Sequence, residues 1–268
     1  MTSVGARGAR DLRRFPWWDV PMQKRPHTSA SGALRRAAAA GVTLAVVTLA
    51  GCATEEPPAP WGAPAEPPIA AATPSAPGIA HLADDAWIVE TSDQTGIPAR
   101  ALRAYAGAAL ATASGKPGCG LGWNTLAAIA FAESDHGRHG GSSVADDGTV
   151  SPPILGVPLD GGDTLDIPDT DRGELDGDPE HDRALGPFQL IPQTWANWHV
   201  DANADGIEDP HNVDDAALAA ASYLCRASDD MAHEDGWVAG IHAFNPNREY
   251  VQKVADAANE YATRAARE

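Results

Sequence analysis

The sequence contains few cysteines, few aromatic residues and no extended pattern of β-strands. Three cysteines stand among 268 residues, and aromatic residues make up 6% of the chain. No series of segments after residue 80 shows the alternation of apolar and polar residues that marks half-buried strands. His136, His139 and His181 lack the spacing of zinc ligands. These absences argue against an all-β domain and against a zinc centre, and they favour a mainly α-helical domain.

Basic residues are scarce as well. The chain has 19 lysines and arginines against 37 aspartates and glutamates. Eight of the basic residues and two of the acidic residues fall within residues 1–51, so the remainder has 11 basic and 35 acidic residues and a net charge of −24. Nucleic acid binds mainly where basic side chains neutralise its phosphates. The charge therefore argues against nucleic acid as a partner.

The first 51 residues have the features of an export signal rather than of a folded domain. An Arg-Arg pair precedes an apolar run, residues 37–50, which has the length of a signal h-region and is too short for a permanent membrane span. The run leads into Leu-Ala-Gly-Cys at residues 49–52, which resembles the processing site of a bacterial lipoprotein. We therefore expect a lipid on Cys52, with an ordinary secretory signal as the alternative. Met22, which opens the basic segment Met-Gln-Lys-Arg, is a candidate true start.

A segment rich in proline, alanine and glutamate follows this signal. Residues 52–79 contain almost no large apolar side chains, so they cannot bury a core and predict a semi-rigid tether. Residues 80–268 have the length of one domain. A lipid on Cys52 would anchor this exported domain in the cell envelope, at the outer face of the cytoplasmic membrane.

The two remaining cysteines, Cys119 and Cys225, belong to a domain that we expect to be exported. Disulfides form and persist in oxidising compartments outside the cytoplasm. We therefore expect these two cysteines to be bonded, which would tie the loop before the Glu133 helix to the helix around Tyr223. Two separate buried thiols are the alternative.

Helical periodicity is clear in five segments of the domain, and one long segment lacks it. Between His136 and Leu185, glycine, aspartate and proline dominate. A long stretch without periodicity inside a compact domain is unusual unless it serves a function. We expect a substrate-binding lip there, with a disordered insertion as the alternative. The expected helices are Pro98–Ala113, Gly122–Glu133, Asp214–Arg226, Trp237–Phe244 and Arg248–Arg267.

The most informative residue is Glu133, at the end of the second of these helices. Leu126, Ile129 and Ala130 precede it by seven, four and three residues, so they share its face of the helix. Burial of that face and the negative end of the helix dipole both raise the pKa of a carboxyl group. A carboxylic acid that keeps its proton near neutral pH is the general acid that a glycosidase needs. The alternative is a glutamate that reaches out to water.

Three motifs in a fixed order carry a resemblance to a known family. They are Ala-Glu-Ser-Asp-His-Gly at residues 132–137, Asp-Arg-Ala-Leu-Gly-Pro-Phe-Gln-Leu-Ile-Pro-Gln-Thr-Trp at residues 182–195, and Phe-Asn at residues 244–245. Over residues 96–262 the chain resembles the lytic murein transglycosylases of the B type, in the form common in actinobacteria. The resemblance implies a lysozyme-like α domain, here with a long Gly/Asp-rich insertion and an EF-hand-like loop.

The resemblance also implies roles for individual residues. Glu133 would be the only essential carboxylate, and Gln189 matches the glutamine that lines the sugar cleft. Asn245 matches the asparagine of the family's Tyr-Asn pair, but Phe244 stands in place of the tyrosine and lacks its hydroxyl group. Asp-Arg-Ala-Leu-Gly replaces the usual Ser-x-x-Gly-Ala-x-Gly lead-in, so no catalytic serine is carried over. The expected substrate-binding residues are Ser134, Gln189, Phe244 and Asn245.

A single carboxylate is enough for the reaction that the resemblance implies. Glu133 would protonate the oxygen of the β-1,4 bond between N-acetylmuramic acid and N-acetylglucosamine in peptidoglycan strands. As a carboxylate it would then deprotonate the muramoyl 6-hydroxyl, which closes a 1,6-anhydro ring without a cofactor. Asp135 is a weak candidate for the second carboxylate that most glycosidases use. The alternatives are a muramidase that hydrolyses the same bond, and a non-catalytic, calcium-stabilised peptidoglycan-binding lipoprotein.

An acidic loop further along has cation-binding spacing. Asp201, Asn203 and Asp205 occupy positions 1, 3 and 5 of an EF-hand loop, glycine follows at position 6, and position 7 contributes a backbone carbonyl. Position 12 is an asparagine, and the resemblance implies closure by a later aspartate instead. A solvated acidic turn is the alternative, and a similar run at residues 169–178 has no support from the family. We expect one structural Ca²⁺ bound by Asp201, Asn203, Asp205, Ile207 and Asp215.

Overall fold

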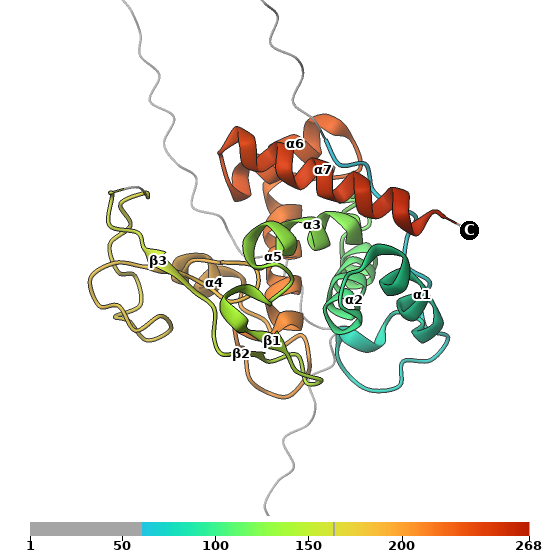
Figure 1. Ribbon diagram of the computed structural model, residues 1–268, viewed down its shortest axis with the longest axis horizontal. Coiled ribbons are helices and arrows are strands. Elements are labelled where there is room, and N and C mark those ends of the chain that lie inside the picture. Colours follow the sequence, from blue (N-terminus) through green and yellow to red (C-terminus); the bar gives the residue numbers. More distant parts are fainter. Residues whose placement is uncertain (1–60, 163, 268) are drawn as a thin grey trace, which may run out of the picture. The chain divides into compact units, whose positions relative to one another are not determined.

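The computed structural model describes residues 61–162 and 164–267, so the predictions for residues 1–51 and for Cys52 lie outside it. Ala59–Glu268 form one unit, and its described part is built mainly of α-helices (Figure 1), as the sequence predicts. None of the helices in this part is long and apolar enough to cross a membrane. The five expected helices correspond to α2, α3, α5, α6 and α7. The helices are α1 Asp85–Thr95, α2 Ala99–Gly115, α3 Trp123–Ser134, α4 Pro192–Trp198, α5 Val213–Ala227, α6 Glu234–Phe244 and α7 Arg248–Ala265, with short 3₁₀ segments η3 Ile79–His81 and η4 His139–Gly141.

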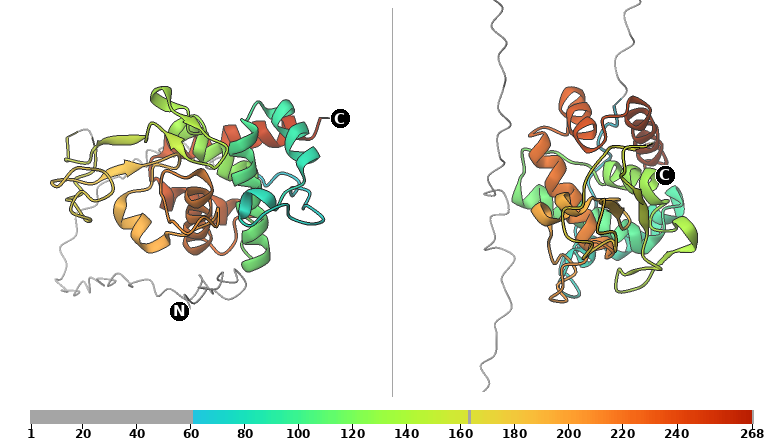
Figure 2. Two further views of the ribbon diagram at one scale, coloured as in Figure 1. Left: turned by 90° about the horizontal axis from the view of Figure 1, so that it is seen from below. Right: turned by 90° about the vertical axis from the view of Figure 1, so that its left-hand side faces the viewer.

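Helix α3 lies among the other helices and is buried on nearly all sides. Residues 123–130 are all buried. The apolar side chains and alanines of α3 lie on all its faces rather than along one stripe, so every face can pack against a neighbour. Helices α2, α5 and α7 pack around it (Figure 1, Figure 2). The Trp237 indole of α6 donates a hydrogen bond to Thr125 Oγ1 at 3.0 Å. A helix enclosed in this way holds the residue at its end, Glu133, in a defined position.

Helix α7 covers α3 with one apolar stripe. Asn247 caps its start, because its Oδ1 accepts hydrogen bonds from the N–H groups of Glu249 and Tyr250 at 2.8 and 3.2 Å. The cap fixes the first turn of α7, which carries Tyr250. The stripe recurs at the three- and four-residue spacing of an amphipathic helix. It consists of Val251, Val254, Ala255, Ala257, Ala258 and Tyr261.

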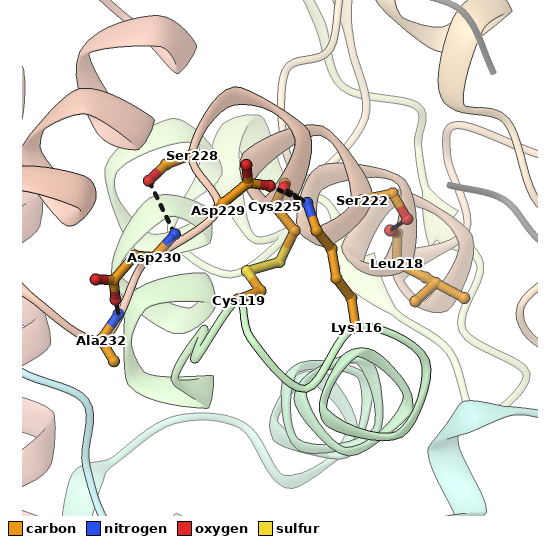
Figure 3. Close-up of a disulfide and its surroundings, with 9 residues drawn as sticks. All are labelled: Lys116, Cys119, Leu218, Ser222, Cys225, Ser228, Asp229, Asp230 and Ala232. Carbon is orange, nitrogen blue, oxygen red and sulfur yellow. Dashed lines mark hydrogen bonds and ion pairs between the residues drawn. A yellow bond between two sulfur atoms is a disulfide. The ribbon is translucent and has the colours of Figure 1, made fainter. Parts of the chain in front are cut away.

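A disulfide joins Cys119, in the loop before α3, to Cys225 near the end of α5 (Figure 3). The Cα atoms lie 5.5 Å apart and both side chains are buried, which agrees with the pairing expected from the sequence. Lys116 donates to the Cys225 carbonyl oxygen and pairs with Asp229 at 2.8 Å. The N–H of Met231 donates to the Cys119 carbonyl oxygen at 2.6 Å. These contacts brace the segment that leads into α3 against the end of α5.

The folded unit begins earlier than the sequence suggests. The tether prediction covers residues 52–79, but residues 61–66 are hydrogen-bonded to α3 and α7. Further along, the backbone of Ile69 and Ala71 is bonded to that of Asp84 and Leu82. The Trp123 indole donates to the Glu66 carbonyl oxygen at 3.1 Å, and the buried Asn124 amide bonds to the backbone of Ala63 and Ala65. Proline-rich composition predicts a solvated spacer, but here side chains of α3 supply partners for its backbone polar groups. This corrects the prediction for residues 61–79, while residues 52–60 lie outside the described part.

The described residues of the long segment between α3 and α4, 135–162 and 164–191, are folded. The loops between its last two strands extend to one side of the helices (Figure 1, Figure 2). Aspartate side chains hold these loops: Asp182 accepts hydrogen bonds from the N–H and the hydroxyl of Thr170, both at 2.8 Å. The acidic residues therefore build turns, and the disordered alternative does not hold. The segment forms two antiparallel pairs, β1 Ser143–Val144 with β2 Val150–Ser151 and β3 Leu155–Pro158 with β4 Arg183–Leu185.

Candidate active site

Glu133 occupies the last turn of α3, where its carboxyl group meets a tyrosine from α7. The Tyr250 hydroxyl donates a hydrogen bond of 2.6 Å to Glu133 Oε1. Both residues are partly buried, and the distance is that of a strong O–H···O bond. The two residues are 117 positions apart in the sequence. Sequence reasoning found Glu133 and missed Tyr250.

The spacing of apolar residues along α7 could have pointed to Tyr250. Val254, Ala258 and Tyr261 follow it by four, eight and eleven residues, so Tyr250 lies beside the buried stripe of the helix. A tyrosine in this position brings a hydroxyl group into a partly buried place, where the group needs a partner. The sequence does not say that the partner is Glu133, because that depends on how α7 packs on α3.

Burial raises the pKa of Glu133 from its ordinary value of 4.5 to about 7, as the apolar helix face predicts. The hydrogen bond from Tyr250 and the positive charge of Lys253 act in the opposite direction, because they favour the ionised carboxylate. Burial also raises the pKa of Tyr250 well above its usual value, so the phenol stays a donor. Near pH 7 Glu133 is therefore divided between acid and carboxylate. A group that gives up a proton and then takes one back needs both states.

Helix α3 ends just after Glu133 through a run of left-handed backbone. Asp135, His136 and Gly137 have φ values of 51°, 59° and 80°, and two of them are not glycine, which makes the turn strained. The His136 ring holds the turn in place. Its Nδ1 lies 3.2 Å from the Tyr105 hydroxyl of α2, and its Nε2 lies 2.9 Å from the Tyr261 hydroxyl of α7. The end of the Glu133 helix is thus anchored between two other helices.

His136 is neutral at physiological pH. Burial, and after it the charge of Arg138, lowers the pKa of this imidazole from 6.5 to about 4. A neutral imidazole has one donor nitrogen and one acceptor nitrogen, which matches its two hydroxyl partners. His136 therefore has a structural role beside the site.

Ser134 does not have the position expected of a substrate-binding residue. Its side chain is buried; the hydroxyl donates to the Pro187 carbonyl oxygen at 2.7 Å and accepts from the Gly137 N–H at 2.9 Å. A hydroxyl group has one proton to donate, and here that proton is used within the protein. The prediction is corrected: Ser134 ties the end of α3 to the turn at residues 186–190.

Gln189 lies in that turn, directly after β4. Its Nε2 donates to the Gly186 carbonyl oxygen at 2.8 Å. Its Oε1 faces β3, because a Cβ placed on Gly156 would lie 3.2 Å from it. The contact between Pro187 and Ser134 joins the same turn to the end of α3. Gln189 therefore stands between β3 and the segment that adjoins Glu133.

Phe244 and Asn245 form the junction between α6 and α7. The Phe244 ring is partly buried and packs edge-on against Tyr223, with ring centroids 5.9 Å apart. The Asn245 Oδ1 accepts a hydrogen bond of 3.0 Å from the N–H of Asn247, the residue that caps α7. The Asn245 contact supports the residue that caps α7, and the expected role of Phe244 and Asn245 in substrate binding stays a prediction.

Asp135 does not supply a second buried carboxylate. Its side chain is about half exposed and pairs with Arg138 at 2.7 Å. Glu133 thus remains the carboxyl group with a raised pKa at this helix end.

The backbone of the acidic loop at residues 201–209 is hydrogen-bonded to the side chain of Asp215 in α5. The Asp215 Oδ1 accepts from the N–H groups of Ala202 and Asn203, and its Oδ2 accepts from that of Asp209, at 2.7–3.2 Å. Burial raises the pKa of Asp215 to about 7, and the charge of Asp201 acts in the same direction. A bound cation would relieve this pair of carboxylates, so the chemistry of the loop fits a calcium site.

The expected calcium ligands are nevertheless turned toward their own loop. Asp201 accepts from the N–H groups of Asp205 and Gly206, and Asp205 accepts from that of Ile207. Asn203 Oδ1 accepts from the N–H of Asp205 at 3.0 Å. Such bonds stabilise an acidic turn by themselves. The Ca²⁺ at residues 201–215 therefore stays a prediction.

Among the described residues, the acidic groups that do converge within 4.8 Å are Asp169, Asp171 and Asp182, in the loops between β3 and β4. Asp169 accepts from the N–H groups of Asp171, Arg172 and Gly173. These hydrogen bonds form a turn, and the turn by itself explains why the three aspartates lie close together.

A cavity of about 370 Å³ lies between α2 and the acidic loop, and Glu133 does not line it. Its walls include Arg100, Arg103, Asn203 and Asp205. Arg100 pairs with the buried Asp214 at 2.6 Å, so its charge is satisfied within the protein. The cavity therefore gives no reason to move the candidate site away from Glu133.

The residues and their geometry carry the functional argument by themselves. Comparisons with protein-family models, with curated proteins and with solved structures gave no match to this chain.

Proposed function

We propose that this chain is a peptidoglycan lytic transglycosylase, a glycan-cleaving lyase with a lysozyme-like α domain of the B type. The observation that carries the proposal is the Glu133–Tyr250 pair, in which a carboxyl group with a pKa of about 7 accepts a 2.6 Å hydrogen bond. The motifs at residues 132–137, 182–195 and 244–245 support the family. The mainly helical fold, in which Glu133 lies in the last turn of the enclosed helix α3, is compatible with it.

The first step is protonation of the leaving group. Tyr250 occupies Oε1 of Glu133, which leaves Oε2 to donate its proton to the bridge oxygen between muramoyl C1 and the next sugar. The C1–O bond breaks, and the 2-acetamido carbonyl of the substrate stabilises the cationic sugar. Glu133 becomes a carboxylate, and the Tyr250 hydrogen bond stabilises that charge.

The second step returns the proton to Glu133. The carboxylate removes the proton of the muramoyl 6-hydroxyl, and the oxygen bonds to C1 to close the 1,6-anhydro ring. No water enters the product, and Glu133 ends the cycle as it began. Tyr250 supplies a hydroxyl group directly at Glu133, so the hydroxyl absent from Phe244 is not needed for this contact.

Digestion of purified peptidoglycan, followed by mass measurement of the released muropeptides, tests the proposal. Anhydro-muramoyl ends support it. Reducing ends would assign the chain to the hydrolytic muramidases. Binding without release would make it a non-catalytic peptidoglycan-binding lipoprotein. The Glu133→Gln variant serves as the inactive control, and Glu90→Gln, at an exposed residue of α1, serves as the active one.

The proposal includes export, attachment and calcium. Cys52 carries the lipid and holds the domain at the outer face of the cytoplasmic membrane, where peptidoglycan strands are its partner. The proposed tether excludes the segment around Ala63, Ala65 and Glu66, because its backbone is hydrogen-bonded to side chains of α3. One Ca²⁺ at the loop of Asp201, Asn203, Asp205, Ile207 and Asp215 stabilises the fold and takes no part in the chemistry.

A further inference from the structure

Lys253 of α7 reaches the same helix end as Tyr250. The two residues are three positions apart, so they lie on neighbouring parts of one face of α7. The Lys253 Nζ donates to the Ala132 carbonyl oxygen at 3.2 Å, and it lies 5.6 Å from the centre of the Phe131 ring. Tyr250 binds the Glu133 carboxyl group itself. One face of α7 therefore contacts three successive residues at the end of α3.

Lys253 provides a hydrogen-bond donor for a carbonyl group near the end of α3. The last carbonyl groups of a helix have no partner within the helix. At the end of α3, the carbonyls of Ala130 and Phe131 accept from the N–H groups of the left-handed turn, and the carbonyl of Ser134 accepts from the N–H of Arg138. The Ala132 carbonyl instead meets the ammonium group of Lys253.

The position of this contact matters because Ala132 directly precedes Glu133. The end of a helix carries partial negative charge, and a cation at that end stabilises it. Without a cation, the helix end and an ionised Glu133 repel each other. A lysine at this carbonyl offsets the repulsion without touching the carboxyl group.

We propose that Lys253 is a positioning residue for Glu133, which caps the Ala132 carbonyl and keeps one positive charge beside the carboxyl group. The inference rests on the proposed function, because it concerns the balance between the acid and base forms that the two proton transfers need. The groups shown to act on Glu133 within the described residues are Tyr250 and Lys253, both from α7. The charge of Lys253 lowers the pKa of Glu133 against the larger effect of burial.

Three substitutions separate the charge of Lys253 from its hydrogen bond. Lys253→Arg keeps the charge and the donor, Lys253→Gln keeps a donor without charge, and Lys253→Met keeps neither. Lys253 is exposed, so these variants remove no buried packing, and matched melting temperatures verify the fold. Arg264→Gln, which removes a charge further along α7, is the control.

The direct measurement is an NMR titration of Glu133 in full-length protein labelled with ¹³C in the glutamate carboxyl groups. The Glu133 signal is the one that disappears in Glu133→Gln. In Lys253→Gln and Lys253→Met the midpoint should rise by ~0.2–0.7 pH unit, the size of effect of one charge at a helix end. Lys253→Arg and Arg264→Gln should keep the midpoint of the wild type. Equal midpoints in all five proteins would overturn the proposal.

In the pH profile of kcat/KM for peptidoglycan release, the midpoint of the alkaline limb should rise by the same amount in Lys253→Gln and Lys253→Met. A change in KM with an unmoved limb would mean that Lys253 contacts substrate, which also overturns the proposal. Absence of release by the wild type would refute the proposed function instead, while the titration would still decide the role of Lys253.

Discussion

Glu133→Gln tests the chemistry and the electrostatics of the site in one variant. The amide keeps the size of the side chain and can still accept the Tyr250 hydrogen bond, but it has no acidic proton. General acid–base action contributes ~10²–10⁴-fold to a rate, so glycan cleavage should fall by at least this factor. The fold should remain, because the surroundings of α3 are unchanged.

The same variant should be more stable than the wild type at high pH. The pKa of Glu133 is about 7 in the folded protein against an ordinary value of 4.5. Below pH 4.5 the group is protonated in both states and stability is unaffected. As the pH rises from 4.5 through 7, the unfolded chain releases its proton first, and the folded state loses stability. The loss levels off at about pH 8, once the folded group is ionised as well, and amounts to about 3 kcal/mol.

Glutamine has no such loss, so the difference in melting temperature should depend on pH. For a unit of this size about 3 kcal/mol corresponds to roughly 6–12 °C. Calorimetric melting between pH 4 and pH 8.5 measures it for the wild type, Glu133→Gln and the exposed control Glu90→Gln. Glu133→Gln should gain stability above pH 7 and match the wild type near pH 4. A difference that is the same at both pH values would refute the argument that Glu133 is held in a desolvating site.

Four further predictions concern other parts of the molecule. Tyr250→Phe should raise the Glu133 pKa and lower kcat about 10- to 100-fold, since a hydrogen bond to a charged group contributes roughly 1.5–3 kcal/mol; an unchanged pH profile would contradict this. Thiol labelling of denatured, unreduced protein should leave Cys119 and Cys225 unlabelled, and stoichiometric labelling of both would show that the bond is absent in solution. Cys52→Ala should move the protein out of the membrane fraction, and unchanged fractionation would point to another anchor. Asp205→Ala should abolish the rise in melting temperature with Ca²⁺, ~2.7 kcal/mol at a hundredfold excess over Kd; a wild type that ignores both calcium and chelator would refute the calcium site.

Local sequence patterns predicted five of the seven helices in the described part, missing α1 and α4, and they predicted the raised pKa of Glu133. The phase of Leu126, Ile129 and Ala130 predicts an apolar helix face that ends in a carboxyl group, and burial does raise its pKa. Two cysteines in a domain expected to be exported predict their own pairing, because no other partner is left for either. These features depend on spacing within a segment or on simple counting, which a sequence displays directly.

In two places, composition or a motif predicted a role that the structure does not support. They are the proline-rich segment and Ser134. Residues 61–79 have the composition of a tether, but α3 offers side chains such as Asn124 that bond to their backbone. Ser134 belongs to a motif whose glutamate is catalytic by resemblance, yet its hydroxyl is used to hold Pro187. In both cases the partner comes from a distant part of the chain, so local reading could not supply it.

The sequence by itself indicated Glu133 as the candidate acid, and the tertiary structure decided what surrounds it. Tyr250 and Lys253 lie more than 115 residues after Glu133, and only the packing of α7 on α3 brings their side chains to the end of that helix. Helical phase is a local property set by neighbouring residues. The contact between two helices depends on the fit of their whole surfaces and on the turns that end them, and so the hydrogen bond and the charge that adjust Glu133 are visible only in the folded molecule.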